Sequence, residues 1–162
     1  MRLDQGPVEL SSACVLVFVR VNKKDNLAEI PLISIVDDDV SIRNSTGRLV
    51  RSFGFRVEAF ASALEFLGSG SVEDTACLIL DVSMPEMDGL ELQRQLAEVN
   101  RQIPIVFLTA TASEDEQRRA MKAGAVDFLR KPVGEQPLIK AIRAALRRGR
   151  QNENECRNPE PK

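Results

Sequence analysis

Short apolar runs alternate with amphipathic stretches along the chain from residue 32 onward. Each apolar run has the length of a strand, and the residues that follow it place their apolar positions at helical spacing. Alternation of this kind is typical of βα units, whose strands form a parallel sheet. The pattern predicts five strands, at residues 32–36, 56–60, 77–81, 104–109 and 126–129.

Five helices are expected between and after these strands. The third presents Leu92, Leu96 and Val99 on one face, which predicts that this face packs on the sheet. The fourth opens with Ser113, and Glu116 follows three residues later in a capping-box pattern. The predicted helices cover residues 42–53, 61–67, 90–99, 113–123 and 136–148.

The two ends of the chain differ from this body. Residues 1–31 contain one apolar run, 13–19, followed by a polar stretch, so we expect a flexible extension or an added edge strand. That run is far shorter than a membrane span and lacks the features of a signal peptide. Residues 149–162 are rich in Gly, Asn, Glu, Arg and Pro and are expected to form a flexible tail. The body, 32–148, is the size of one domain.

Composition narrows the function. The 22 basic and 24 acidic residues give a net charge of -2, which argues against a nucleic-acid or anionic-membrane surface over the whole molecule. The absence of histidine excludes histidine catalysis, histidine metal ligation and a phosphohistidine. The three cysteines form no CxxC pattern, so a disulfide framework or zinc site is not expected. A reducing cytoplasm fits this cysteine usage best.

Acidic residues follow two of the predicted strands. Asp37, Asp38 and Asp39 come directly after the first strand, and Asp81 ends the third. If these strands are parallel neighbours, four carboxylates meet at the sheet edge where open α/β folds place their sites. Such a cluster repels itself unless a cation or a proton lies in it.

These acids belong to an ordered set of motifs at strand ends. Asp81 lies in Leu-Asp-Val-Ser-Met-Pro-Glu-Met-Asp-Gly, Thr109 closes Ile-Val-Phe-Leu-Thr, and Lys131 precedes Pro132. Together with Asp37-Asp38, the set resembles the receiver domain of two-component response regulators over residues 32–148. In detail it is most similar to FixJ-like receivers, which precede a LuxR-type helix-turn-helix. The resemblance implies a flavodoxin-like, doubly wound α/β fold whose five parallel strands have the order 2-1-3-4-5, with five helices.

The resemblance also implies a Mg²⁺ site. Asp38 and Asp81 would be direct ligands, Asp37 would act through water, and the backbone carbonyl of Ser83 would complete the protein's share. Carboxylate and carbonyl oxygens suit this small hard cation. Asp39 has a simpler interpretation as the N-cap of the first helix, and Asp88 as the N-cap of the third.

Phosphoryl transfer is the chemistry that the resemblance implies. Asp81 would be the phosphoacceptor, Lys131 would contribute a positive charge to the phosphoryl group, and Thr109 a hydroxyl donor. Thr109 and Phe128 would form the switch, and the Lys131-Pro132 bond would be cis. Taken alone, Lys131 is equally a surface lysine, Thr109 a residue that favours strands and Phe128 an ordinary core residue.

The function expected is that of a single-domain response regulator in a phosphorelay. A sensor histidine kinase or a phosphotransfer protein would be its donor, and an unidentified downstream protein its target. A phosphorylation-dependent homodimer is compatible with this expectation, whereas direct nucleic-acid or membrane binding is not expected. The protein would be cytoplasmic and would not be an enzyme beyond its own phosphorylation and dephosphorylation.

Two rival functions remain. A haloacid-dehalogenase-like phosphatase also uses an Asp nucleophile at a strand end with Mg²⁺, but it needs a second Asp where this chain has Ser83. A phosphorylation-independent adaptor would have no need of the complete set of acids, Thr109 and Lys131. Two departures from the commoner receiver pattern, Glu86 where many relatives have glycine and Thr111 two residues past Thr109, bear on the lifetime of the phosphoryl group.

Overall fold

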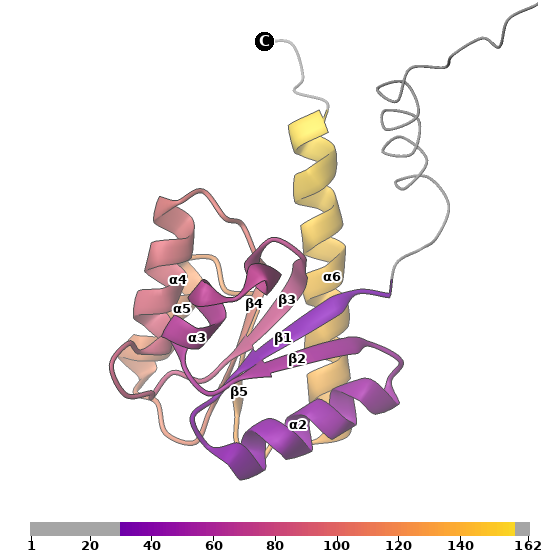
Figure 1. Cartoon of the computed structure of the whole chain (residues 1–162). Helices are drawn as coiled ribbons and strands as arrows, with labels where there is room; N and C mark the ends of the chain where they lie inside the picture. The colour runs from indigo at the N-terminus through magenta and orange to yellow at the C-terminus, as the bar shows by residue number, and fades with distance from the viewer. Residues whose placement is uncertain (1–29, 158–162) are drawn as a thin grey trace, which may run out of the picture.

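The structure is a computed structural model that describes residues 30–157. Its centre is a parallel sheet with the strand order β2-β1-β3-β4-β5, which confirms the expected topology (Figure 1). β1, β3 and β4 are almost entirely buried, because helices cover both faces of the sheet. The strands are β1 (Leu32–Val36), β2 (Arg56–Phe60), β3 (Thr75–Leu80), β4 (Ile105–Thr109) and β5 (Asp127–Arg130).

Helices lie on both faces of the sheet (Figure 1). Each face has its own hydrophobic cluster. One cluster joins the sheet to α2 (Val40–Ser52) and α6 (Glu135–Arg157). The other joins it to α3 (Ala63–Gly68), α4 (Gly89–Glu98) and α5 (Glu114–Lys122). A 3-10 turn, Gly70–Val72, leads into β3. The expected doubly wound arrangement is therefore confirmed.

The last helix is longer than the sequence pattern indicated. α6 continues to Arg157 instead of ending at Arg148, so residues 149–157 of the expected tail are helical. Gly149, the first residue of the expected tail, lies beside Pro104, and a side-chain carbon added at Gly149 would be 3.4 Å from the proline ring. The helix thus remains in contact with the domain at this glycine. The expectations for residues 1–29 and 158–162 lie outside the described residues.

The end of α4 also differs from the prediction. Val99 was expected on the inner face of the helix, but the helix ends at Glu98 and the Val99 side chain is 66% exposed. The reason is local, because Asn100 adopts a left-handed backbone conformation with φ of 57° and turns the chain out of the helix. By contrast, the predicted capping box of α5 is confirmed, with Ser113 and Glu116 bonding to each other's backbone N–H.

The loop after β3 depends on a close backbone approach at Gly89. The Gly89 N–H donates to the Val82 carbonyl at 2.9 Å, and a side-chain carbon at Gly89 would lie 2.2 Å from the Asp81 carbonyl oxygen. Only glycine fits there. Within this loop Glu86 has a φ of 68°, in the left-handed region that favours glycine.

Replacing Gly89 with alanine should therefore be costly. We expect Gly89→Ala to lower the free energy of unfolding by about 1–3 kcal/mol, as overpacking against backbone usually does. Gly68→Ala is the matched control, because nothing lies within 4 Å of a side-chain carbon added at Gly68. Urea unfolding of both variants measures the difference, and equal stabilities would contradict the assigned close approach.

Candidate functional site

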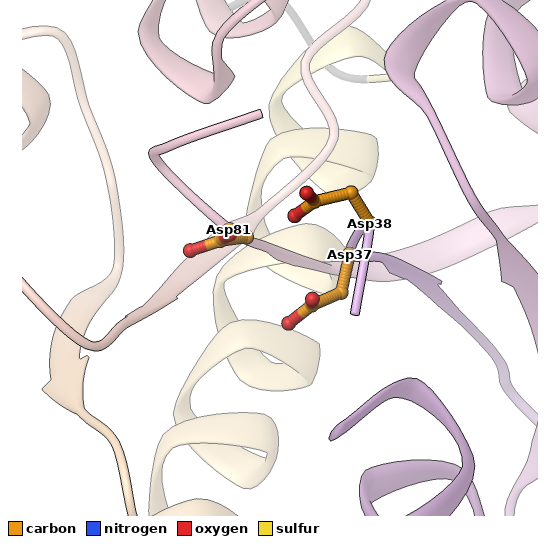
Figure 2. A group of neighbouring side chains, drawn as sticks. All are labelled: Asp37, Asp38 and Asp81. Atoms are coloured by element: carbon orange, nitrogen blue, oxygen red, sulfur yellow. The ribbon is translucent and has the colours of Figure 1, made fainter. Parts of the chain in front are cut away.

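Three carboxylates meet at the carboxyl edge of the sheet. Asp37 and Asp38 follow β1, and Asp81 follows the neighbouring parallel strand β3. One oxygen from each carboxylate lies within 4.8 Å of the others (Figure 2). Asp37 and Asp81 are 2% and 6% exposed, whereas Asp38 is exposed. The sequence-predicted acidic cluster is therefore brought together at one edge.

Backbone hydrogen bonds hold the two strand ends in place. The Asp81 N–H donates to the Val36 carbonyl at 2.9 Å, and the Asp37 N–H donates to the Phe60 carbonyl at 3.2 Å. Arg43 of α2 adds a bond from its guanidinium to the Asp37 carbonyl at 2.6 Å. The sequence analysis did not identify this arginine, although it lies one helical turn past the acids. The acids are thus fixed by the sheet and by the first turns of α2.

Asp39 is confirmed as the helix cap. Its carboxylate accepts the backbone N–H groups of Ser41 at 2.8 Å and Ile42 at 3.0 Å. These two bonds, with the Ile42 bond the larger cause, lower the pKa of Asp39 below its ordinary value. Asp88 likewise accepts the Glu91 N–H at 2.8 Å as the N-cap of α4. Both acids serve helix starts, as expected.

Lys131 joins two members of the acidic cluster. Its Nζ donates to Asp37 Oδ2 at 2.6 Å and lies 3.5 Å from Asp81 Oδ1. The Lys131 N–H donates to the Thr109 carbonyl at 2.8 Å, which continues the β4–β5 pairing, and the Lys131-Pro132 bond is cis as expected. The ammonium is thus held by two carboxylates, its side chain being only 11% exposed.

The electrostatic balance at Asp81 is unfavourable to its charge. Burial raises the pKa of Asp81, the Lys131 ammonium opposes that rise, and the nearby Asp37 and Asp38 carboxylates add to it. One lysine therefore does not neutralise the cluster. Three carboxylates offering hard oxygen atoms within 4.8 Å of one another fit a small divalent cation such as Mg²⁺.

Thr109 and Phe128 lie on the two strands beside this cluster. Thr109 ends β4 and is 1% exposed, and its hydroxyl donates to the Thr111 carbonyl at 3.0 Å. Phe128 is 8% exposed, and its ring centre is 5.6 Å from that of Phe107. Phe128 thus packs as a core residue, and the switch role of this pair stays a prediction.

Ser83 lies two residues past Asp81 and is exposed. It lines a shallow hollow together with the loop between β4 and α5. Arg130, the last residue of β5, lines the same hollow. The sequence analysis did not identify Arg130. Two signals were visible: it directly precedes Lys131, and it lies two residues after Phe128, so both share one face of the strand.

Known proteins are similar to this chain in sequence and fold. Residues 33–143 match the family model of the response regulator receiver domain. The response regulator protein TmoT of Ectopseudomonas mendocina is 48% identical over 116 residues, which cover 72% of this chain and 53% of TmoT. The solved structure of the response regulator StyR has 43% identity and a TM-score of 0.74, covering 80% of this chain and 65% of StyR. The crystal structure of FixJ-N has 35% identity and a TM-score of 0.66, covering 72% of this chain and 94% of the FixJ-N chain.

The length of these relatives limits what the similarity covers. The chain spans about half the length of the curated relatives that it matches. The likeness therefore concerns the βα body, and the activity of the whole relatives lies beyond it. Between residues 30 and 157, no helix has the combination of length and apolar character needed to cross a membrane.

Proposed function

The chain belongs to the response regulator receiver domain family, and from this premise we propose that it accepts a phosphoryl group on Asp81 from a histidine kinase or a phosphotransfer protein. The observation that carries the proposal is the buried carboxylate of Asp81, held beside Asp37, Asp38 and the Lys131 ammonium. Without a role in chemistry, this cluster would be an unfavourable accumulation of like charge.

The transfer forms one bond and breaks one. A carboxylate oxygen of Asp81 attacks phosphorus, and the bond from phosphorus to the donor atom breaks, the donor leaving with the electron pair. Lys131 already lies 3.5 Å from Asp81 Oδ1, so its ammonium is placed to contact an oxygen of the arriving group. The Thr109 hydroxyl would exchange the Thr111 carbonyl for a phosphoryl oxygen as acceptor.

Asp38, Asp81, the Ser83 carbonyl and, through water, Asp37 would hold Mg²⁺. When bound, the ion would supply positive charge that offsets the carboxylates and the phosphoryl oxygens. The donor set supports this assignment, because it offers oxygen atoms only. We propose no further enzymatic activity, since Ser83 stands where a haloacid-dehalogenase-like phosphatase needs its second Asp.

The proposal is tested by mass spectrometry. Incubation with acetyl phosphate and Mg²⁺ should add the mass of one phosphoryl group, and excess EDTA should prevent the addition. A protein that gains no such mass, or gains it equally with EDTA, would contradict the proposed Mg²⁺-dependent phosphorylation.

We propose further that the phosphorylated state is recognised by another protein at the face formed by α5, β5 and α6. Ala120 is the buried residue of α5, and its neighbour Met121 is 41% exposed. Little apolar area therefore holds α5 in place, so it should move more easily than α2 or α6. Four further expectations stay predictions. They are an unidentified downstream partner, a phosphorylation-dependent homodimer, action as a single-domain regulator and a cytoplasmic location.

Thr109→Ala should separate phosphorylation from this response. The variant should still accept phosphate on Asp81, but it cannot donate a hydrogen bond to a phosphoryl oxygen. A hydrogen bond to such a charged acceptor contributes about 1.5–3 kcal/mol, so its loss should weaken the shift of the two-state equilibrium roughly ten- to a hundredfold. Amide NMR shifts with and without beryllofluoride measure the response over residues 113–131. If the wild-type shifts change only around Asp81, this mechanism is wrong.

A further inference from the structure

A shallow hollow, formed by the loops after β3 and β4, opens on the face of the sheet that carries α5. The loop from Ala110 to Ser113 lines it, with Ser83 from the loop after Asp81, Glu116 from α5 and Arg130 from β5. The hollow is mostly polar and includes one cation and one anion. Ser83 follows Asp81 by two residues, so this surface begins close after the proposed phosphoacceptor.

Strand geometry explains why Arg130 takes part in this surface. Its Cα pairs with that of Thr109, and Phe128, two residues earlier, packs in the cluster on the α5 face of the sheet. Residues two apart on a strand share a face, so Arg130 lies on the α5 side. Arg130 is exposed, and no carboxylate of residues 30–157 forms an ion pair with it. Its guanidinium is therefore free to meet an anion.

The negative charges around Asp81 would repel an anionic phosphodonor, and a cation nearby would offset that repulsion. Asp37, Asp38 and Asp81 face a single ammonium, Lys131, which two of them already hold. Glu116 adds a further negative charge at the hollow, because hydrogen bonds from Ser113 lower its pKa. Within the hollow, a phosphate compound that approaches Asp81 is therefore repelled by Glu116 and attracted by Arg130, before it reaches Lys131.

We propose that Arg130 is a positioning residue for small anionic phosphodonors of the acyl phosphate class, which it attracts toward Asp81 while Glu116 opposes their approach. This inference rests on the proposed function. Guanidinium matches phosphate oxygens in charge and planar geometry, so an arginine suits this task better than a lysine. With acetyl phosphate, Asp81 forms the new oxygen–phosphorus bond, and acetate leaves with the electron pair of the broken bond.

The test follows the phosphorylation rate as a function of donor concentration in Mg²⁺ buffer. Arg130→Gln should raise the half-saturating concentration of acetyl phosphate roughly two- to fivefold, the size of an exposed charge interaction, and leave the maximal rate unchanged. Phosphoramidate, which is less negatively charged, should be affected less. Glu116→Gln, which can still cap α5, should lower the half-saturating concentration of acetyl phosphate. Arg130→Lys should recover part of the loss.

Arg48→Gln is the matched control, because it removes an equal charge from an exposed position on α2. If it changes the half-saturating concentration as much as Arg130→Gln does, the effect is one of net charge and the inference is wrong. A fall in maximal rate alone, or equal effects on both donors, would also overturn it. Normal labelling of the wild type in those cases leaves the proposed function intact, whereas a wild type that neither donor phosphorylates would overturn both.

Discussion

Asp81→Asn should gain no phosphoryl group from acetyl phosphate and Mg²⁺ under conditions that label the wild type fully. The amide oxygen is a poor nucleophile, and the substitution also removes a carboxylate from the predicted metal site. Asp39→Asn is the matched control, because Asp39 caps α2 and asparagine caps equally well. It should be labelled normally. An Asp81→Asn protein that still gains the mass would place the acceptor elsewhere.

Asp81→Asn should also be more stable than the wild type when no metal is present. The folded protein raises the pKa of Asp81, so the stability linked to its proton is full below the unfolded pKa and is lost as the pH rises through the folded one. Above the folded pKa the wild type therefore carries an unfavourable ionised group that asparagine removes.

Added Mg²⁺ should reverse the order of the two proteins. A ligand at a hundred times its dissociation constant stabilises the folded state by about 2.7 kcal/mol, and the variant lacks part of the site. Thermal unfolding of both proteins, with EDTA and with Mg²⁺ across a pH series, measures this. Equal responses to Mg²⁺ would show that Asp81 is not a ligand.

Lys131→Met should produce the largest loss of stability among the site variants. Lys131 and Asp37 form an ion pair of 2.6 Å whose side chains are 11% and 3% exposed. Removing one partner of such a buried pair typically costs about 3–5 kcal/mol, because the remaining charge is left without compensation. The exposed Lys140 of α6 supplies the control, and Lys140→Met should change stability by no more than about 0.5 kcal/mol.

The double variant Lys131→Met/Asp37→Asn distinguishes pairing from packing. Because asparagine leaves no buried charge at residue 37, the double variant should recover much of the loss seen in Lys131→Met. Urea unfolding of the two single variants and the double variant gives the coupling energy. If the double variant is as unstable as the sum of the single losses, the ion pair does not account for the effect.

The sequence was sufficient for the sheet and for the acidic edge. The strands were predictable because each combines an apolar run with turn residues, and Asp37, Asp38 and Asp81 follow two of them directly. The strand order and the site roles came from resemblance to a family, since periodicity alone does not order parallel strands. Asp39 and Ser113 were read correctly as caps because capping depends on neighbours in the chain.

Contacts between distant residues were not predictable from local pattern. Asp37 pairs directly with Lys131, 94 residues away, and no local pattern indicates this contact. Val99 has the spacing of an inner residue, but the left-handed turn at Asn100 exposes it. Gly149 was interpreted as the start of a tail, because the local sequence does not reveal its contact with Pro104, which is far away in the chain. The miss at Gly149 thus reflects a tertiary contact, whereas the miss at Val99 arises from a local turn.

Because α6 is long, a small tilt at its first turn displaces its other end by a larger distance. It begins close after Lys131-Pro132, at the acidic edge, and its far end extends past the opposite edge of the sheet (Figure 1). Its 23 residues span about 34 Å at a rise of roughly 1.5 Å per residue. A tilt of about 3° at the Lys131 end of such a rod would displace the Arg157 end by roughly 2 Å. A small adjustment at the acidic edge is thereby magnified at the other side of the domain.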